Sequence, residues 1–139
     1  MNTTAAINAY SKISVESSVM GADPHQLVAL LYEGALLAIA RAREEIRGKH
    51  TEAKGKSISM AIAIVGEGLN ACLDRKAGGK LANDLSALYD YMVKRLVDAN
   101  VHNDVSALNE VAKLLQELKD AWDTIRPQVV GIAGSLARG

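Results

Sequence analysis

Apolar side chains recur along most of the chain at the spacing of amphipathic helices. After residue 50, one stripe consists of Ile58, Ala61, Ile62, Val65, Leu69, Cys72 and Leu73. After residue 80, a second stripe consists of Leu81, Leu85, Leu88, Met92 and Leu96. A third stripe consists of Leu108, Val111, Leu115, Leu118, Trp122 and Ile125. Each follows the i, i+3, i+4, i+7 order that places side chains on one buried helix face.

The segment from residue 24 to about residue 49 is apolar almost all round, which also indicates a helix against a core. No segment shows the sustained apolar–polar alternation of a half-buried strand. The chain therefore predicts four helices of about 20 to 26 residues, each about 30 to 39 Å long. Because the connections between them are short, we predict an all-α fold, an antiparallel four-helix bundle.

Local signals place the ends of these helices. Asp23 is the expected N-cap of the first helix, with Pro24 at the first helical position and Gln26 three residues after the cap. The other predicted boundaries are a cap at Thr51, a break at Gly78–Gly79, a cap at Asn103 and a stop at Pro127.

These boundaries divide the chain into three segments. Residues 1–22 form an N-terminal arm with a short helix, for which two alternatives stay open: it docks on the bundle and caps a groove, or it is mobile. Residues 23–127 form the bundle, and residues 128–139 form a glycine-interrupted tail that we expect to be flexible or weakly helical. A chain of 139 residues suits one domain with one core.

Composition and charge exclude several classes of partner. The chain is 49% hydrophobic and carries 16 basic and 16 acidic residues, so its formal charge is zero. Long-range attraction to nucleic acid or to an anionic membrane has no source in such a balance. The longest apolar stretch, residues 27–40, contains Glu33 and is too short to span a bilayer. The N-terminus has neither a basic start nor an apolar run, so we expect no secretory signal, no membrane insertion and a cytosolic protein.

The residues give little indication of catalysis. The single cysteine, Cys72, excludes an intramolecular disulfide and a four-cysteine zinc site, and we expect it in the core. His25, His50 and His102 lie far apart, and none has a Glu three residues before it, as a di-iron bundle requires. No haem-attachment motif and no glycine-rich phosphate loop occurs. We therefore predict no metal, no cofactor and no enzymatic activity.

One signalling alternative stays open. Histidine phosphotransfer domains are also small four-helix bundles, and they use an exposed histidine in the middle of a helix. His25 is the candidate acceptor, although it stands in the first turn of its helix beside Pro24. The simpler interpretation of His25 is a polar residue at a helix start, and that of Trp122 is an anchor in the core.

The bundle also has more apolar side chains than four stripes need. Tyr89 is about 100° off Leu88 around its helix and Tyr91 is about 200° further, so the two cannot both be central in the core. Met60 and Ile64 align with each other and are turned away from the stripe of the second helix. We therefore expect spare apolar grooves that the arm and a partner segment cover.

Four stretches resemble one known family. They are "INAYSKISVESSV" (7–19), "PHQLVALLYEGAL" (24–36), "LYDYMVKRLVDANVHND" (88–104) and "LNEVAKLLQELKDAW" (108–122). In this order and spacing they resemble the flagellar secretion chaperones of the FliS type. The resemblance implies an antiparallel helical bundle that binds the disordered C-terminal segment of flagellin in the cytosol. It also implies that the chaperone prevents premature polymerisation and assists delivery to the cytosolic domain of the flagellar type III export gate.

The resemblance also implies site residues. Ile7 and Tyr10 are the expected contacts of the arm, and of other flagellar partners and regulators. For the client groove, helical phase points to Met60, Ile64, Tyr89 and Tyr91, an assignment made from the residues alone. Two competing interpretations are a phosphotransfer bundle with His25 as acceptor and an oligomeric structural component.

Overall fold

The computed structural model describes the backbone of residues 23–138 and the side chains of residues 23–125. Within this range the chain forms α2 (Pro24–Arg47), α3 (Thr51–Ala63), α4 (Arg75–His102) and α5 (Val105–Arg138), and α3 continues directly into a π-helix, η1 (Ile64–Leu69). No strand occurs among the described residues, so the prediction of an all-α fold is confirmed. Ile7, Tyr10 and the rest of the predicted arm lie outside the described residues.

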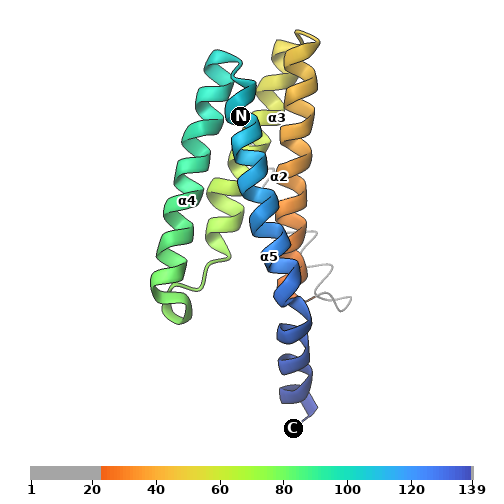
Figure 1. The fold of residues 1–139 in the computed structure, drawn as a ribbon, viewed down its shortest axis with the longest axis vertical. Helices are drawn as coiled ribbons and strands as arrows, with labels where there is room; N and C mark the ends of the chain where they lie inside the picture. The colour runs from red at the N-terminus through yellow and green to blue at the C-terminus, as the bar shows by residue number, and fades with distance from the viewer. Residues whose placement is uncertain (1–22, 139) are drawn as a thin grey trace.

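The four helices pack side by side as a bundle (Figure 1). α2 packs against α3 and α5, and α4 packs against the same two helices. α2 and α4 therefore stand at opposite corners, as do α3 and α5. Successive helices run in opposite directions, which confirms the predicted antiparallel four-helix bundle.

The predicted start of α2 is confirmed. Pro24 occupies the first turn, and the side chain of Asp23 accepts a hydrogen bond from the backbone N–H of Gln26 at 2.8 Å. A carboxylate here satisfies an amide that has no partner inside the helix, and its charge suits the positive end of the helix dipole.

Three other predicted boundaries are wrong. Thr51 is the first residue of α3 and not its cap, because His50 holds the N-cap position. Asn103 adopts a left-handed conformation, with φ 51°, and ends α4, while Asp104 accepts from the N–H of Ala107 at 3.2 Å and caps α5. The helical backbone of α5 passes Pro127 and continues to Arg138.

The expected break at Gly78–Gly79 is a kink inside α4 rather than its start. Asp74 caps α4 by accepting from the N–H groups of Lys76 and Ala77, so one helical turn precedes the glycines. Gly79 has φ 50° and ψ −122°, which an L side chain rarely adopts. This glycine lets α4 change direction without ending.

The core lies between all four helices and follows the predicted stripes. Its largest fully buried side chains are Tyr89, Ile39, Ile58, Ile64, Leu69, Met92, Leu96, Leu108, Leu115, Val65 and Val111. Cys72 was expected in this core, but it is exposed beyond the end of η1. Along the described part of the chain, no helix is long and apolar enough to cross a membrane.

A buried lysine joins two helices at one end of the bundle. The Lys54 ammonium of α3 donates to the backbone carbonyl of Asn100 at 2.9 Å and to Oδ1 of Asn103 at 2.7 Å. Lys54 is buried, yet its charge stands at the C-terminal end of α4, where the helix dipole favours a cation. Hydrogen bonding to the helix end therefore offsets the cost of burying this charge.

Candidate functional site

The four residues assigned to a client groove from helical phase do not share one surface. Met60 on α3 and Tyr91 on α4 are exposed, whereas Ile64 and Tyr89 are buried. The expectation that Ile64 and Tyr89 face a groove is wrong for this arrangement of the helices. Client contact through Met60 and Tyr91 stays a prediction.

Ile64 is buried where α3 continues into η1, and its neighbours Ala63 and Val65 are buried as well. Positions five apart differ by about 140° in an α-helix, but they come close to the same side in a π-helix, which closes its hydrogen bonds over five residues. Ile64 and Leu69, the two ends of η1, are both buried in the core. A search for a constant period of 3.6 residues places Ile64 beside Met60 instead.

Tyr89 is buried because its hydroxyl meets that of Tyr32 across the bundle. The two oxygens lie 2.7 Å apart, which links the opposite corners α4 and α2. Burial raises the pKa of both phenols above their ordinary value, and for Tyr89 the hydrogen bond with Tyr32 raises the pKa further. This pair holds the core together and offers no surface to a partner.

Tyr91 belongs to an exposed network that joins α4 to α5. Its hydroxyl donates to Oε2 of Glu110 at 2.6 Å, and Nε of Arg95 donates to Oε1 of the same carboxylate at 2.7 Å. The hydrogen bond from Tyr91, followed by that from Arg95, lowers the pKa of Glu110. Within residues 23–125, these contacts to Glu110 are the hydrogen bonds and ion pairs that link α4 with α5.

Beyond this network, α4 and α5 present apolar side chains that are only partly covered. Leu88 lies one turn before Tyr91 on α4, and Leu114 lies one turn after Glu110 on α5. Because Tyr91 and Glu110 contact each other, Leu88 and Leu114 lie on the sides of α4 and α5 that face each other. We define the α4 row as Leu81, Leu85 and Leu88, and the α5 row as Leu114, Leu118 and Ile125. Leu81 is 66% exposed and Ile125 is 41% exposed, and the other four contact the core while remaining partly exposed.

The two rows are partly exposed because their helices separate. α4 and α5 lie close together near the turn that joins them and lie farther apart at the opposite end of the bundle (Figure 1). The second half of α5 follows α2 instead, through Lys119, which contacts Glu33 at 3.8 Å and Asp123 at 2.7 Å. The two rows are therefore partly exposed apolar surfaces on α4 and α5.

Two expectations about chemistry, the absence of a metal site and the alternative of phosphotransfer at His25, can be compared with the described residues. No group of three or more His, Cys, Asp or Glu side chains within them could hold a metal ion. His25 is only 5% exposed, and Nε2 of its ring lies 2.8 Å from the backbone carbonyl of Trp122. A phosphoacceptor has to present its imidazole to a kinase, so the burial of His25 argues against the phosphotransfer alternative.

Comparison with known proteins identifies the family. The sequence matches the family described as "Flagellar protein FliS" over residues 6–129. The chain belongs to the FliS family. It is 47% identical over 128 residues to the flagellar secretion chaperone FliS of Salmonella typhimurium strain LT2, covering 92% of this chain and 95% of that protein.

Two further FliS relatives match over most of their length. The flagellar secretion chaperone FliSB of Pseudomonas aeruginosa is 44% identical over 125 residues, which cover 90% of this chain and 98% of the relative. The flagellar secretion chaperone FliS of Escherichia coli K12 is 43% identical over 122 residues, which cover 88% and 90%. These FliS proteins are named as chaperones and not as enzymes, which favours a binding protein.

The sequence indicated the rows of this FliS chain but gave them another role. Apart from Leu114, the residues of both rows belong to stripes that predicted inward-facing positions, and the inner halves of those stripes are indeed buried. The missing information was the separation of α4 from α5. Leu81 is one sequence signal of this exposure. It stands directly after Gly78–Gly79 and Lys80, so few neighbouring side chains are there to cover it.

Proposed function

We propose that this chain is a cytosolic export chaperone that binds the C-terminal segment of flagellin. It prevents premature polymerisation of flagellin and assists delivery to the cytosolic domain of the type III export gate. The observation that carries this proposal is the 47% identity to a relative that is named as a flagellar secretion chaperone. The match covers 95% of that relative. The partly exposed apolar rows on α4 and α5 support a binding role because they are surfaces that a client can cover.

The two rows suit an amphipathic helix. From Leu114 to Ile125 the α5 row extends over eleven residues, which is about 16 Å at the helical rise. A client helix of about three turns, with apolar residues at i, i+3 or i+4, and i+7, would contact both rows at once. Tyr91 stands at one end of the rows, where its ring can contact the client and its hydroxyl stays bound to Glu110.

Binding would couple to folding of the client. A disordered segment loses conformational entropy when it forms a helix, and the burial of apolar surface has to offset that cost. The holding step needs no nucleotide, since it involves no chemical reaction. Ile7 and Tyr10 remain our predicted contacts for the export gate and for other flagellar regulators.

The first test is calorimetric titration of the protein with the C-terminal segment of flagellin from the same organism, at several temperatures. We expect tight binding and a clearly negative heat-capacity change, which is the mark of apolar burial. A folded protein that forms no complex with the segment would refute the proposed function.

Matched surface variants then locate the binding face. Leu81→Ser and Ile125→Ser each remove a partly exposed apolar group from one row, and each should weaken binding about tenfold, or about 1.4 kcal/mol. Leu37→Ser is the control, because Leu37 is 53% exposed on α2, away from both rows. Equal losses for the three variants would show that the client does not bind between α4 and α5. Met60→Ala tests the remaining exposed residue of the sequence-based assignment in the same titration.

A further inference from the structure

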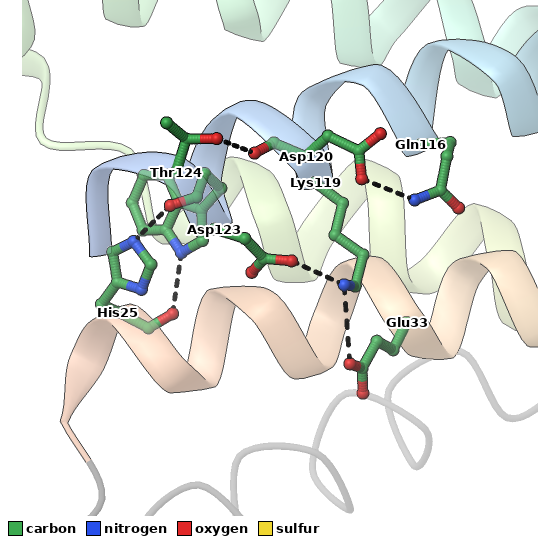
Figure 2. Close-up of polar contacts among 8 residues, drawn as sticks. His25, Glu33, Gln116, Lys119, Asp120, Asp123 and Thr124 are labelled. Carbon is green, nitrogen blue, oxygen red and sulfur yellow. Dashed lines mark hydrogen bonds and ion pairs between the residues drawn. The ribbon is translucent and has the colours of Figure 1, made fainter. Parts of the chain in front are cut away.

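The start of α2 and the second half of α5 are joined by a reciprocal pair of hydrogen bonds. Nε2 of His25 lies 2.8 Å from the carbonyl of Trp122, and Nε1 of Trp122 donates to the carbonyl of His25 at 2.8 Å. The two rings are stacked, with centroids 4.3 Å apart and planes inclined by 12°. Figure 2 shows His25 pointing from the start of α2 toward α5.

The chemistry of this pair fixes its geometry. A carbonyl oxygen only accepts, so Nε2 of His25 carries the proton that the Trp122 carbonyl receives. Indole has one donor and no acceptor, so the carbonyl of His25 is a fitting partner for it. Each residue thus binds the backbone of the other helix, and the pair holds α2 and α5 in one relative position.

This position matters for the two apolar rows. Trp122 lies one turn after Leu118 and three residues before Ile125, so it shares a helix segment with the α5 row. Among the residues with described side chains, the polar contacts between α4 and α5 are those of Tyr91 and Arg95 with Glu110, and none follows further along α5. The position of the α5 row relative to the α4 row therefore depends in part on how α5 is held to α2.

The pair also stands shortly before a proline within α5, Pro127. Pro127 has no N–H, so it cannot donate to the carbonyl of Asp123 in the preceding turn. A helix that loses a backbone hydrogen bond frays or bends more easily there. A contact at Trp122, one residue before Asp123, stabilises the segment that carries the α5 row.

We propose that His25, through Trp122, is a positioning residue that holds the α5 row at the distance from the α4 row that a client helix requires. This inference rests on the proposed function, since it assigns a determinant of the same binding face. His25 itself does not contact the client. It acts through the backbone of α5 and keeps the face preformed, which lowers the cost of ordering it on binding.

The test uses His25→Ala in the full chain, with His25→Gln as a conservative variant and Arg43→Ala as a matched control. Alanine removes the Nε2 donor and the stacked ring, while the glutamine amide can still donate to the Trp122 carbonyl. Arg43 also links α2 to α5, by donating to Oδ1 of Asn109 at 3.0 Å, but at the other end of the helix pair. Hydrogen exchange of residues 114–125, emission of the single tryptophan and calorimetric affinity for the flagellin segment are measured for each.

We expect His25→Ala to increase exchange across residues 114–125 at least tenfold, to shift Trp122 emission to the red and to weaken client binding about tenfold. His25→Gln should show smaller changes in exchange, emission and client binding than His25→Ala, and Arg43→Ala should leave the exchange of residues 114–125 unchanged. Unchanged exchange in His25→Ala, or equal effects of His25→Ala and Arg43→Ala, would overturn the inference. If the wild-type chain does not bind the segment, the proposed function fails, and the exchange comparison still decides whether His25 positions α5. If His25→Ala is unfolded, His25→Gln against Arg43→Ala decides in the same way.

Discussion

The paired hydroxyls of Tyr32 and Tyr89 link opposite corners of the bundle, and their removal gives a quantitative test of the core. In Tyr89→Phe, the ring keeps its packing but the hydroxyl of Tyr32 loses its partner at 2.7 Å. Both residues are buried, so water cannot replace that partner. A buried hydroxyl left unsatisfied costs about 1 to 3 kcal/mol, and we expect this loss for Tyr89→Phe and for Tyr32→Phe alike.

The double variant should lose much less than the sum of the single variants. Replacing both hydroxyls by hydrogen leaves two apolar edges facing each other and no unsatisfied group, which can be nearly neutral. We expect the double variant to lie within about 1 kcal/mol of the wild type. The pairwise coupling is then larger than about 1 kcal/mol and opposite in sign to the single losses.

Urea unfolding, followed by far-ultraviolet circular dichroism and by emission of Trp122, measures these free energies of unfolding. Agreement of the two probes establishes two-state unfolding, which the comparison requires. Additive losses in the double variant would refute the reasoning, since they would show that the hydroxyls do not satisfy each other.

The same pair predicts a loss of stability at high pH. Burial raises the pKa of Tyr32 and Tyr89 in the folded state above the ordinary value of 10.0. A phenol whose pKa is raised on folding stabilises the fold fully below the unfolded pKa, and that contribution is lost as the pH rises above it. We therefore expect the free energy of unfolding to fall above about pH 10 in the wild type, and to fall less steeply in the double phenylalanine variant.

Four substitutions test the polar contact of Lys54 and the glycines of α3 and η1. In urea unfolding, Lys54→Met should lower the free energy of unfolding by about 2 to 3 kcal/mol, because the end of α4 loses a buried ammonium donor. Lys56→Met is the control on an exposed side chain of the same helix, and it should change the free energy of unfolding by less than about 0.5 kcal/mol. Gly55→Ala should raise it by about 0.5 to 1 kcal/mol, since an added Cβ meets nothing within 4 Å and alanine favours the helix. Gly66→Ala should show a smaller gain or a loss, because its Cβ would lie 3.1 Å from Cγ2 of Val93, and thermal unfolding of the two glycine variants compares them directly.

The sequence was sufficient for the helices because their periodicity is long and regular. Met92 and Leu96 in α4, and Leu108 and Leu115 in α5, lie in the core as the stripes predicted. It was harder to predict which of two adjacent polar residues caps a helix. Asn103 and Asp104 can both cap a helix start, and only the left-handed backbone of Asn103 assigns the cap of α5 to Asp104.

Two errors concern the stripe of α3 and η1, and they have different origins. At a period of 3.6 residues Ile64 lies beside Met60 but also beside Ala61, and it is buried because this stretch of helix is covered on several sides. For Cys72, the same period continued the stripe past Leu69, although η1 and the end of the helix had already changed its phase. A single extra residue in a turn has no signature in composition, so the sequence alone could not locate it.

The binding face was missed for a different reason. A stripe at helical spacing shows that a helix face will be covered, but it does not show whether the same chain or a partner covers it. Leu96 and Leu115 are buried by the bundle itself, whereas Leu81 and Ile125, on the same stripes, remain exposed where α4 and α5 separate. For the proposed function, this continuity has a physical consequence. A client helix bound as proposed would pack on rows whose inner members already contact the core, so binding would extend the packing of the bundle by one helix without requiring a new kind of surface.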